Sequence, residues 1–418
     1  MYVTGVDRRN GRKPRTVSVA FALAIVAIAA AVVFARTRAV EGIVTAPSAR
    51  AASPTPPPTA GPLPTGWTRL TLPPQARSGS AAVWTGSKLL DWGGCDPSIN
   101  DRCKAVASGY AFDPASRTWS DLPPAPVPGS GAHGVWTGSE ALFVGIDEES
   151  KKIHSEAFDP ATGTWRKLAT APIGPRYSPV LVWTGTKLVV WGGSERNQPG
   201  IESTGAIFDP VKNKWTRMAD APHGLNLASG VWTGTRVLVF GSLLNGGNHA
   251  DTSTSVGETY DLATDRWREI APSNLSPQAT SAMWAGGRLV AWDYNDRWQT
   301  YDPARDRWSA TARMPLGFSE CYPDSVLVGT AMFAFFCGQA ALYDAATNAW
   351  SKVRGGMLAE TIYSKAYKSD IKLWRFADMA AGGDVVYFEA EGISLTKNGE
   401  ACYGCSGSPH SFWAYRPA

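Results

Sequence analysis

The chain has 418 residues, of which 44% are hydrophobic and 18% are charged. It is therefore too apolar for a disordered chain and too long for one small core. The 18 Trp, 42 Gly and 30 Pro favour strands joined by tight turns over helical bundles. Residues 1–40 carry seven basic residues and one acidic residue, which leaves 33 basic and 35 acidic residues in the remainder. A nucleic-acid-binding domain needs a basic excess, so we expect no nucleic-acid partner.

The N-terminal region predicts a membrane anchor. Residues 17–35 contain no charge, and about 20 apolar residues span a bilayer. Five basic residues between Arg8 and Arg15 precede this segment and favour a cytoplasmic N-terminus. The sequence thus predicts a cytoplasmic tail over 1–16, a transmembrane signal-anchor helix over 17–35, and a single-pass cell-membrane protein with an extracytoplasmic body. A cleaved signal peptide is the alternative, although its apolar region is usually only about 7–15 residues long, and it also exports the body.

A Pro-rich linker follows over residues 36–65. Seven Pro lie between Pro47 and Pro64, and they hold the chain extended and poorly packed. We expect this segment to be a stalk between the membrane and a folded body over 66–418.

The body repeats a unit of about 50 residues. The first half of the unit contains two apolar runs around a Trp-Thr-Gly turn, as in VLVWTGTKLVVWGG from Val180. The second half contains two short runs around an Asp-Pro turn and ends near a Trp, as in AFDPATGTW from Ala157. Alternating apolar positions and turn residues predict four strands in each unit, which we name a to d.

These units resemble the kelch repeat, with its Gly-Gly turn at Gly93-Gly94 and Gly192-Gly193, its Tyr/Phe-Asp-Pro segment and its later Trp. The resemblance implies an all-β fold, a kelch-type β-propeller. Seven Trp end the d segments and predict seven blades: Trp67, Trp119, Trp165, Trp215, Trp267, Trp308 and Trp350. Trp67 has no strands a to c before it, and the C-terminal FWAYRP has no strand d after it. We therefore expect an N-terminal d strand to close the ring. Fifteen of the 18 Trp occupy repeat positions, which favours core packing over a binding platform.

The two faces of the predicted propeller differ. The short a-to-b and c-to-d turns share one face, here called the turn face, and the b-to-c and d-to-a connections, which differ in length, share the other, called the loop face. Variable loops on a rigid scaffold commonly carry binding sites. Candidate ligand-binding residues near the start of strand a, suited to an acidic or sugar-like ligand, are Arg77, His133, Arg176, Tyr177, His223, Asn226, Tyr322 and Arg375. The alternative is that each is a solvated or structural residue.

All six Cys fall on the loop face. An even number of Cys in an exported body favours disulfides, and loop lengths suggest the pairs Cys95 with Cys103, Cys321 with Cys337, and Cys402 with Cys405. A metal site at Cys402, Cys405 and His410 is the alternative, but the spacing offers no fourth ligand. We expect no metal and no cofactor.

Two classes of function remain. The leading hypothesis is a binding or scaffold propeller that engages a protein or carbohydrate ligand through its loop face. No G-x-S-x-G, H-E-x-x-H or P-loop spacing occurs in the sequence. The alternative is an enzyme on the same fold, resembling the kelch-type copper oxidases (galactose-oxidase-like) or sialic acid mutarotases. The residues that the copper enzymes use cannot be aligned with this sequence. The Arg, His and Tyr candidates near the channel are compatible with a mutarotase but do not imply one.

The basic flank of residues 17–35 predicts that the C-terminus lies outside the cytoplasm. A reporter enzyme that is active only in the cytoplasm should be inactive when fused after residue 418, and a reporter that is active only outside should work there. Activity of the cytoplasmic reporter at this position would contradict the predicted topology.

Overall fold

In the computed structural model, the described residues are 61–75, 77–96, 104–147, 152–194, 201–243, 254–276, 281–293, 295–316, 324–336, 338–395, 398–399, 401–402 and 409–418. The chain divides into two compact units, Met1–Pro57 and Pro58–Ala418, and every described residue lies in the second. The predicted membrane helix and most of the linker lie outside these ranges. Within them, no helix is long and apolar enough to cross a membrane.

The second unit is built from seven antiparallel sheets, as the repeat predicted. The four main strands of each sheet, in order from a to d, are as follows: β2 (Ser78–Trp84), β3 (Leu89–Asp96), β5 (Gly109–Asp113) and β6 (Thr118–Leu122); β7 (Ser130–Trp136), β8 (Ala141–Asp147), β9 (Lys152–Asp159) and β10 (Thr164–Lys167); β11 (Val180–Trp183), β12 (Leu188–Trp191), β13 (Gly205–Asp209) and β14 (Lys214–Arg217); β15 (Asn226–Trp232), β16 (Val237–Leu243), β17 (Thr254–Asp261) and β18 (Arg266–Glu269); β19 (Ser281–Ala285), β20 (Arg288–Trp292), β21 (Arg297–Asp302) and β22 (Arg307–Trp308); β24 (Asp324–Val328), β25 (Ala331–Phe336), β26 (Gln339–Asp344) and β27 (Ala349–Val353); β30 (Trp374–Gly382), β31 (Val385–Gly392), β34 (His410–Arg416) and β1 (Gly66–Leu70). We number these sheets as blades 1 to 7.

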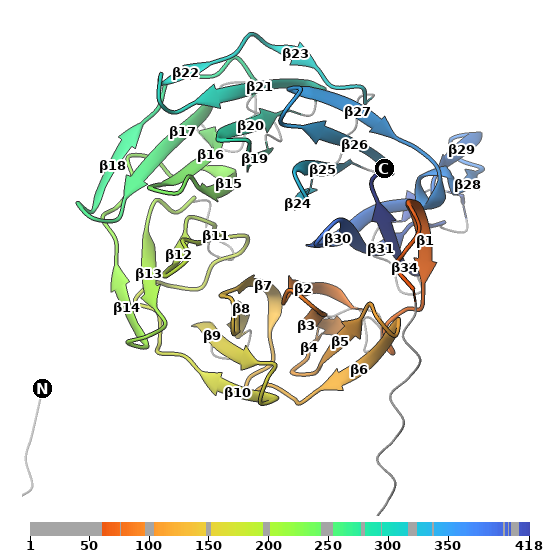
Figure 1. Cartoon of the computed structure of the whole chain (residues 1–418), viewed down its shortest axis with the longest axis horizontal. Coiled ribbons are helices and arrows are strands. Elements are labelled where there is room, and N and C mark those ends of the chain that lie inside the picture. The colour runs from red at the N-terminus through yellow and green to blue at the C-terminus, as the bar shows by residue number, and fades with distance from the viewer. Residues whose placement is uncertain are drawn as a thin grey trace, which may run out of the picture. The chain divides into compact units, whose positions relative to one another are not determined.

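The blades form a ring around a central axis (Figure 1). Strand a of each blade is innermost, and successive inner strands contact one another in the order β2, β7, β11, β15, β19, β24, β30 and back to β2. Apolar clusters fill the spaces between neighbouring blades, as where Phe143 and Phe158 of blade 2 pack with Trp92 of blade 1. The all-β, seven-bladed propeller is confirmed.

Local chemistry explains the two turns of each repeat. In the a-to-b turn of blade 1, Thr85 Oγ1 accepts a hydrogen bond from Lys88 N at 3.0 Å, and Gly86 has φ +92°, a left-handed conformation that favours glycine. In the c-to-d turn, Asp113 Oδ1 accepts from Ala115 N at 2.9 Å. Arg117, four residues after this Asp, is also left-handed, with φ +56°. Such Thr side chains replace main-chain partners in the a-to-b turns of blades 1 to 4, and such Asp side chains do so in the c-to-d turns of blades 1 to 6.

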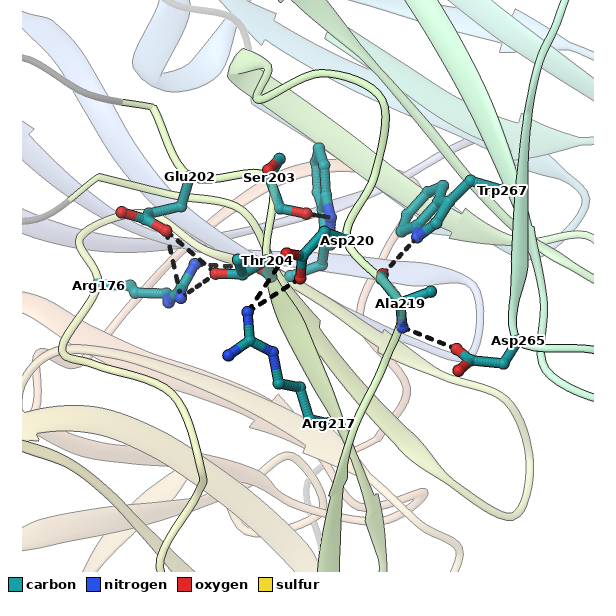
Figure 2. A network of polar contacts seen from close by, with 10 residues as sticks. Arg176, Glu202, Ser203, Thr204, Arg217, Ala219, Asp220, Asp265 and Trp267 are labelled. Atoms are coloured by element: carbon teal, nitrogen blue, oxygen red, sulfur yellow. Dashed lines mark hydrogen bonds and ion pairs between the residues drawn. The ribbon is translucent and has the colours of Figure 1, made fainter.

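The outer Trp residues link each blade to the preceding one. Trp267 Nε1 of blade 4 donates to the carbonyl of Ala219 at 2.8 Å, just after strand d of blade 3, while Ala219 N donates to Asp265 Oδ1 at 2.7 Å (Figure 2). The same indole-to-carbonyl bond joins six of the seven interfaces, with these further pairs: Trp67 to Arg354, Trp119 to Thr71, Trp165 to Pro123, Trp215 to Ala169 and Trp308 to Ala271. We call this bond the tryptophan latch.

Blade 6 differs, because Trp350 Nε1 is buried and has no hydrogen-bond partner among the described residues. The preceding blade 5 has only a two-residue strand β22, followed by β23 (Ala312–Arg313), which pairs with β21. The chain segment that supplies the latch carbonyl elsewhere is therefore differently placed at this interface.

Blade 7 combines strands from both ends of the described chain. Strand β1 pairs antiparallel with β34, with Trp67 opposite Tyr415. The Trp67 ring lies 5.2 Å from Phe388 and 6.3 Å from Trp413, measured between ring centroids. Gly356 lies directly beneath this indole, and a Cβ at Gly356 would come within 2.2 Å of Trp67 Cγ. The absence of a side chain at Gly356, three residues after the outer strand of blade 6, thus leaves room for Trp67.

Several elements add to the four-strand pattern. Strand β4 (Lys104–Ala105) pairs with β3, the hairpin β28 (Thr361–Ser364) and β29 (Ser369–Lys372) precedes blade 7, and β32 (Ser394–Leu395) pairs with β33 (Ala401–Cys402). A short 3-10 helix, η2 (Gly356–Ala359), follows β27. These additions lie in connections between repeat strands, for which the repeat pattern in the sequence makes no prediction.

We predict that Trp67→Ala destabilises the propeller by about 3–5 kcal/mol, because it removes both an aromatic side chain packed between two blades and one latch. Thermal unfolding of the full-length protein should show a lower melting temperature. Trp67→Phe keeps most of the packing but loses the hydrogen bond, so its melting temperature should lie between those of the parent protein and Trp67→Ala. An unchanged melting temperature for Trp67→Ala would show that the pairing of β1 with β34 does not hold the ring closed.

Candidate functional site

The loop-face ends of the inner strands share an unusual backbone. The residue five positions before the strand-a Trp is left-handed in four consecutive blades, with these φ values: Gly79 +66°, Gly131 +52°, Ser178 +50° and Leu227 +51°. The pairing register also shifts at this point in β7 and β15. Leu227 combines this conformation with 39% exposure of an apolar side chain. A bulky non-glycine residue with positive φ is rare and strained, and such strain is concentrated at functional sites.

Two predicted ligand-binding arginines are instead part of the scaffold. Arg77 is 2% exposed, and Nη1 donates to the carbonyls of Gly93 at 3.3 Å and Ser108 at 2.5 Å. Its Nη2 donates to Ser108 Oγ at 2.8 Å, and its guanidinium carbon lies 4.6 Å from the Tyr110 ring centroid. These bonds tie the end of strand b to the start of strand c.

Arg176 does the same in blade 3 and is 5% exposed. Its Nη1 donates to the carbonyls of Gly192 and Thr204, both at 3.1 Å. Its Nη2 contacts Thr204 Oγ1 and lies 3.5 Å from Glu202 Oε2. Figure 2 shows the contacts of Arg176 with Thr204 and Glu202. Both arginines lie 16 residues before the glycine whose carbonyl they bind, so they are equivalent residues of the repeat. Their shared role is to hold the base of a loop.

The smaller candidates lie close to the inner strands. His133 lies within β7 and is half-buried, and burial lowers the pKa of its imidazole. Asn226 begins β15 directly before Leu227. Tyr177 is half-buried and forms an isolated β-bridge with Ser194. Asn226 thus comes from the loop-face end of an inner strand, where ligand contact was expected, whereas His133 lies in the middle of one.

His223 forms a pair that the sequence did not predict. Its Nδ1 lies 2.7 Å from Oε1 of Glu258, a fully buried residue of β17, and 3.9 Å from Glu269 Oε1. Burial raises the pKa of the Glu258 carboxyl, and the His223 bond partly offsets this. The buried carboxylate orients the imidazole through Nδ1, and the other ring nitrogen, Nε2, takes no part in this pair.

Other buried acids also escaped the sequence analysis. Burial raises the pKa of Asp91 in β3 to about 6, although the Ser80 hydroxyl and the Arg77 charge oppose this rise. Burial likewise raises the pKa of Glu156 in β9 to about 7, against the charge of Lys167 and a main-chain bond from Val127. Glu156 and Glu258 both lie three residues before the Asp of the c-to-d turn, where blade 3 has Ala206. Blade 5 has Gln299 and blade 6 has Ala341 at this position. A carboxyl at a repeat position that the other blades fill with uncharged residues was the available signal.

Several predicted site residues lie outside the described part of the chain. These are Tyr322, Cys103, Cys321, Cys337 and Cys405, together with the side chains of Arg375, Cys95 and Cys402. The three disulfide pairs therefore stay predictions. Among the residues that are described, no group of three or more His, Cys, Asp or Glu is arranged to hold a metal ion.

Comparisons with known proteins support the repeat family. No family model matches the chain. The chain is 26% identical over 212 residues to Kelch-like protein 25 of Xenopus tropicalis, covering 46% of this chain and 34% of that protein. It is similar to N-acetylneuraminate epimerases of two Haemophilus influenzae strains, at 24% identity over 221 residues (51% of this chain, 54% of the relative) and 28% over 152 residues (34% and 40%). The matches thus span about a third to a half of the length of these relatives.

A solved structure shares the fold. The structure of YjhT superposes with a TM-score of 0.50 and 14% sequence identity, covering 68% of this chain and 99% of that one. At this identity the likeness concerns the fold alone.

We predict that Arg176→Ala lowers the free energy of unfolding by about 1.5–3 kcal/mol, because it leaves buried carbonyls without a charged donor. Arg217→Ala is the matched control in the same blade, since Arg217 pairs with Asp220 at 3.0 Å but its side chain is 56% exposed against 4% for Arg176. Arg217→Ala should lower the free energy of unfolding by no more than about 1 kcal/mol. Equal melting temperatures for the two variants would contradict the scaffold role of Arg176.

Proposed function

We propose that this chain, a kelch-repeat β-propeller, is a membrane-anchored extracytoplasmic module that binds a protein or glycan ligand through its loop face. The anchor at 17–35, the stalk and the three disulfides belong to this proposal, with their support in the sequence alone. The chain is similar in sequence to one protein named as kelch-like and to two named as epimerases of a sugar acid.

One observation carries the choice of the loop face. Leu227 keeps a left-handed backbone and an exposed apolar side chain at the inner end of a blade, next to Asn226. A left-handed conformation costs an L-residue roughly 1–2 kcal/mol. Folding derives no benefit from an exposed leucine there, since glycine occupies the equivalent position in blades 1 and 2. Contact with a ligand would account for both the residue and its conformation.

The loop face also has two connections with fixed bases, which suits a binding surface. Arg77 and Arg176 fix the bases of loops in blades 1 and 3 by bonds to main-chain carbonyls. Loops held in this way lose less conformational entropy when a ligand binds. The loops themselves differ in sequence and length, which allows specificity without change to the blades.

Catalysis is the second candidate, and the pair of His223 and Glu258 favours it. A histidine oriented by a buried carboxylate can act as a general base or acid, and epimerisation of a sugar acid requires proton transfer. Following the anomers of N-acetylneuraminate by NMR, with His223→Ala as control, would separate this candidate from binding: accelerated interconversion that the variant loses would identify an enzyme.

We predict that Leu227→Gly leaves the melting temperature unchanged or raises it, because glycine adopts positive φ without strain. Ligand capture is tested in a separate variant. Capture is measured with a benzophenone amino acid introduced at 227 in the full-length membrane protein. The matched control is the same group at Val211, which is 92% exposed in a c-to-d turn on the turn face. Cross-links should form from 227 and not from 211. Equal cross-linking from both positions, or none from 227, would overturn the proposed binding face.

A further inference from the structure

A groove of about 690 Å³ lies on the turn face between blades 4 and 5. Blade 4 contributes its a-to-b turn and its outer strands, including Arg236, Asp261 and Arg268, and blade 5 contributes Trp284, Tyr301 and Asp306. This volume falls within the range of small-molecule sites, about 300–1,000 Å³. The groove is on the face opposite to Leu227 and uses none of the residues of the proposed function.

A substitution in the repeat accompanies the groove. The a-to-b turns of blades 1 to 4 have Ser or Thr at the position that Gly287 occupies in blade 5, as in Thr235 of blade 4. Gly287 has φ +76°, and a Cβ added to it would meet no atom within 4 Å. The side chain present in the other blades is therefore absent at the wall of this groove.

The charged part of the lining consists of two ion pairs, and Thr233, Thr235 and Thr259 also line the groove. Arg236 Nη2 lies 3.3 Å from Asp261 Oδ2, and Arg268 Nη2 lies 3.0 Å from Asp306 Oδ2. Main-chain hydrogen bonds, from Ala263 to Asp261 and from Ala271 to Asp306, are the main cause of the lowered pKa of both carboxyls, which keeps them ionised. The charges of the lining are thus fixed and cancel.

These pairs retain hydrogen-bonding capacity. Each guanidinium has five N–H donors, and each makes one bond within the described residues. Asp306 is held in place by Tyr301 OH at 2.7 Å and Ala271 N at 2.9 Å, so its position does not depend on Arg268. Donor-only and acceptor-only groups lie side by side at two places in the groove.

We propose that this groove binds a neutral saccharide of about two sugar units. A sugar hydroxyl both donates and accepts, so vicinal hydroxyls match an adjacent guanidinium and carboxylate. The indole of Trp284 and the side chain of Ile270, both partly buried, supply apolar surface for the C–H face of a sugar ring. The net charge of the lining is zero, so a strongly charged ligand gains no overall electrostatic attraction to the groove.

Binding to the full-length protein is measured by saturation-transfer NMR and calorimetry, with maltose, cellobiose, lactose and N,N′-diacetylchitobiose as probes and N-acetylneuraminate as the anionic comparison. At least one neutral disaccharide should bind, and Arg236→Ala and Arg268→Ala should each weaken its binding about tenfold or more, the fold-change for the loss of one charged hydrogen bond. Both side chains are substantially exposed, 47% and 69%, so the variants should fold.

Two further variants sharpen the test. Gly287→Asn keeps a residue that tolerates positive φ and narrows the groove, so it should also weaken binding without removing any polar group. Arg305→Ala is the matched control, because Arg305 pairs with Asp302 in the blade 5 turn at 2.5 Å and does not line the groove; it should bind as the parent does. The inference is overturned if no neutral disaccharide binds, or if binding survives in both groove arginine variants. Binding that is lost in Leu227→Gly but kept in those variants would support the loop face and refute the groove.

Discussion

The structure depends on one repeated contact, the hydrogen bond from an outer-strand indole to a main-chain carbonyl of the preceding blade. The carbonyl follows strand d, where the chain leaves the sheet and has no ladder partner, so a donor from the next blade supplies its hydrogen bond. Trp215 of blade 3, for example, satisfies Ala169 while its ring packs on Phe208. In this way one side chain fills the space between blades and sets their spacing. Because each blade contacts only its neighbours, stability is close to a sum over such interfaces.

Blade 5 is where the repeat departs from this plan. Its outer strand is short, Trp350 of the next blade has no latch partner among the described residues, and its a-to-b turn reads Ala285-Gly286-Gly287 in place of the Thr-Gly turn. The groove opens at the same blade. The latch missing among the described residues belongs to the interface with blade 6, whereas the groove lies at the interface with blade 4, where Trp308 keeps its latch to Ala271. Blade 5 thus departs from the repeat on both of its sides.

The loop face differs from this. Its loops are unequal in length, but the geometry at the loop bases is the same in blades 1 and 3. Arg77 and Arg176 satisfy the carbonyls at the base of a b-to-c connection, and they do so from equivalent positions. Their charge next to the channel suggested a ligand, but a guanidinium has enough donors to bind several carbonyls at once. The strained residue Leu227 lies beyond this frame and is the better indicator of contact with a partner.

The sequence by itself determined the all-β class, the four-strand unit, the seven blades and the two unlike faces. It could do so because the period of apolar residues and the turn residues are local signals that are repeated several times. It also singled out the outer Trp residues as core, but it could not identify their acceptors, since Ala219 and Trp267 meet only when two blades pack. For the same reason it did not distinguish Arg176, whose donors are consumed inside the protein, from Asn226 at the end of an inner strand. The pairing of His223 with Glu258, the left-handed Leu227 and the groove between blades 4 and 5 were decided only by the tertiary structure. Each depends on contacts between distant residues or on a backbone angle that side-chain identity does not predict.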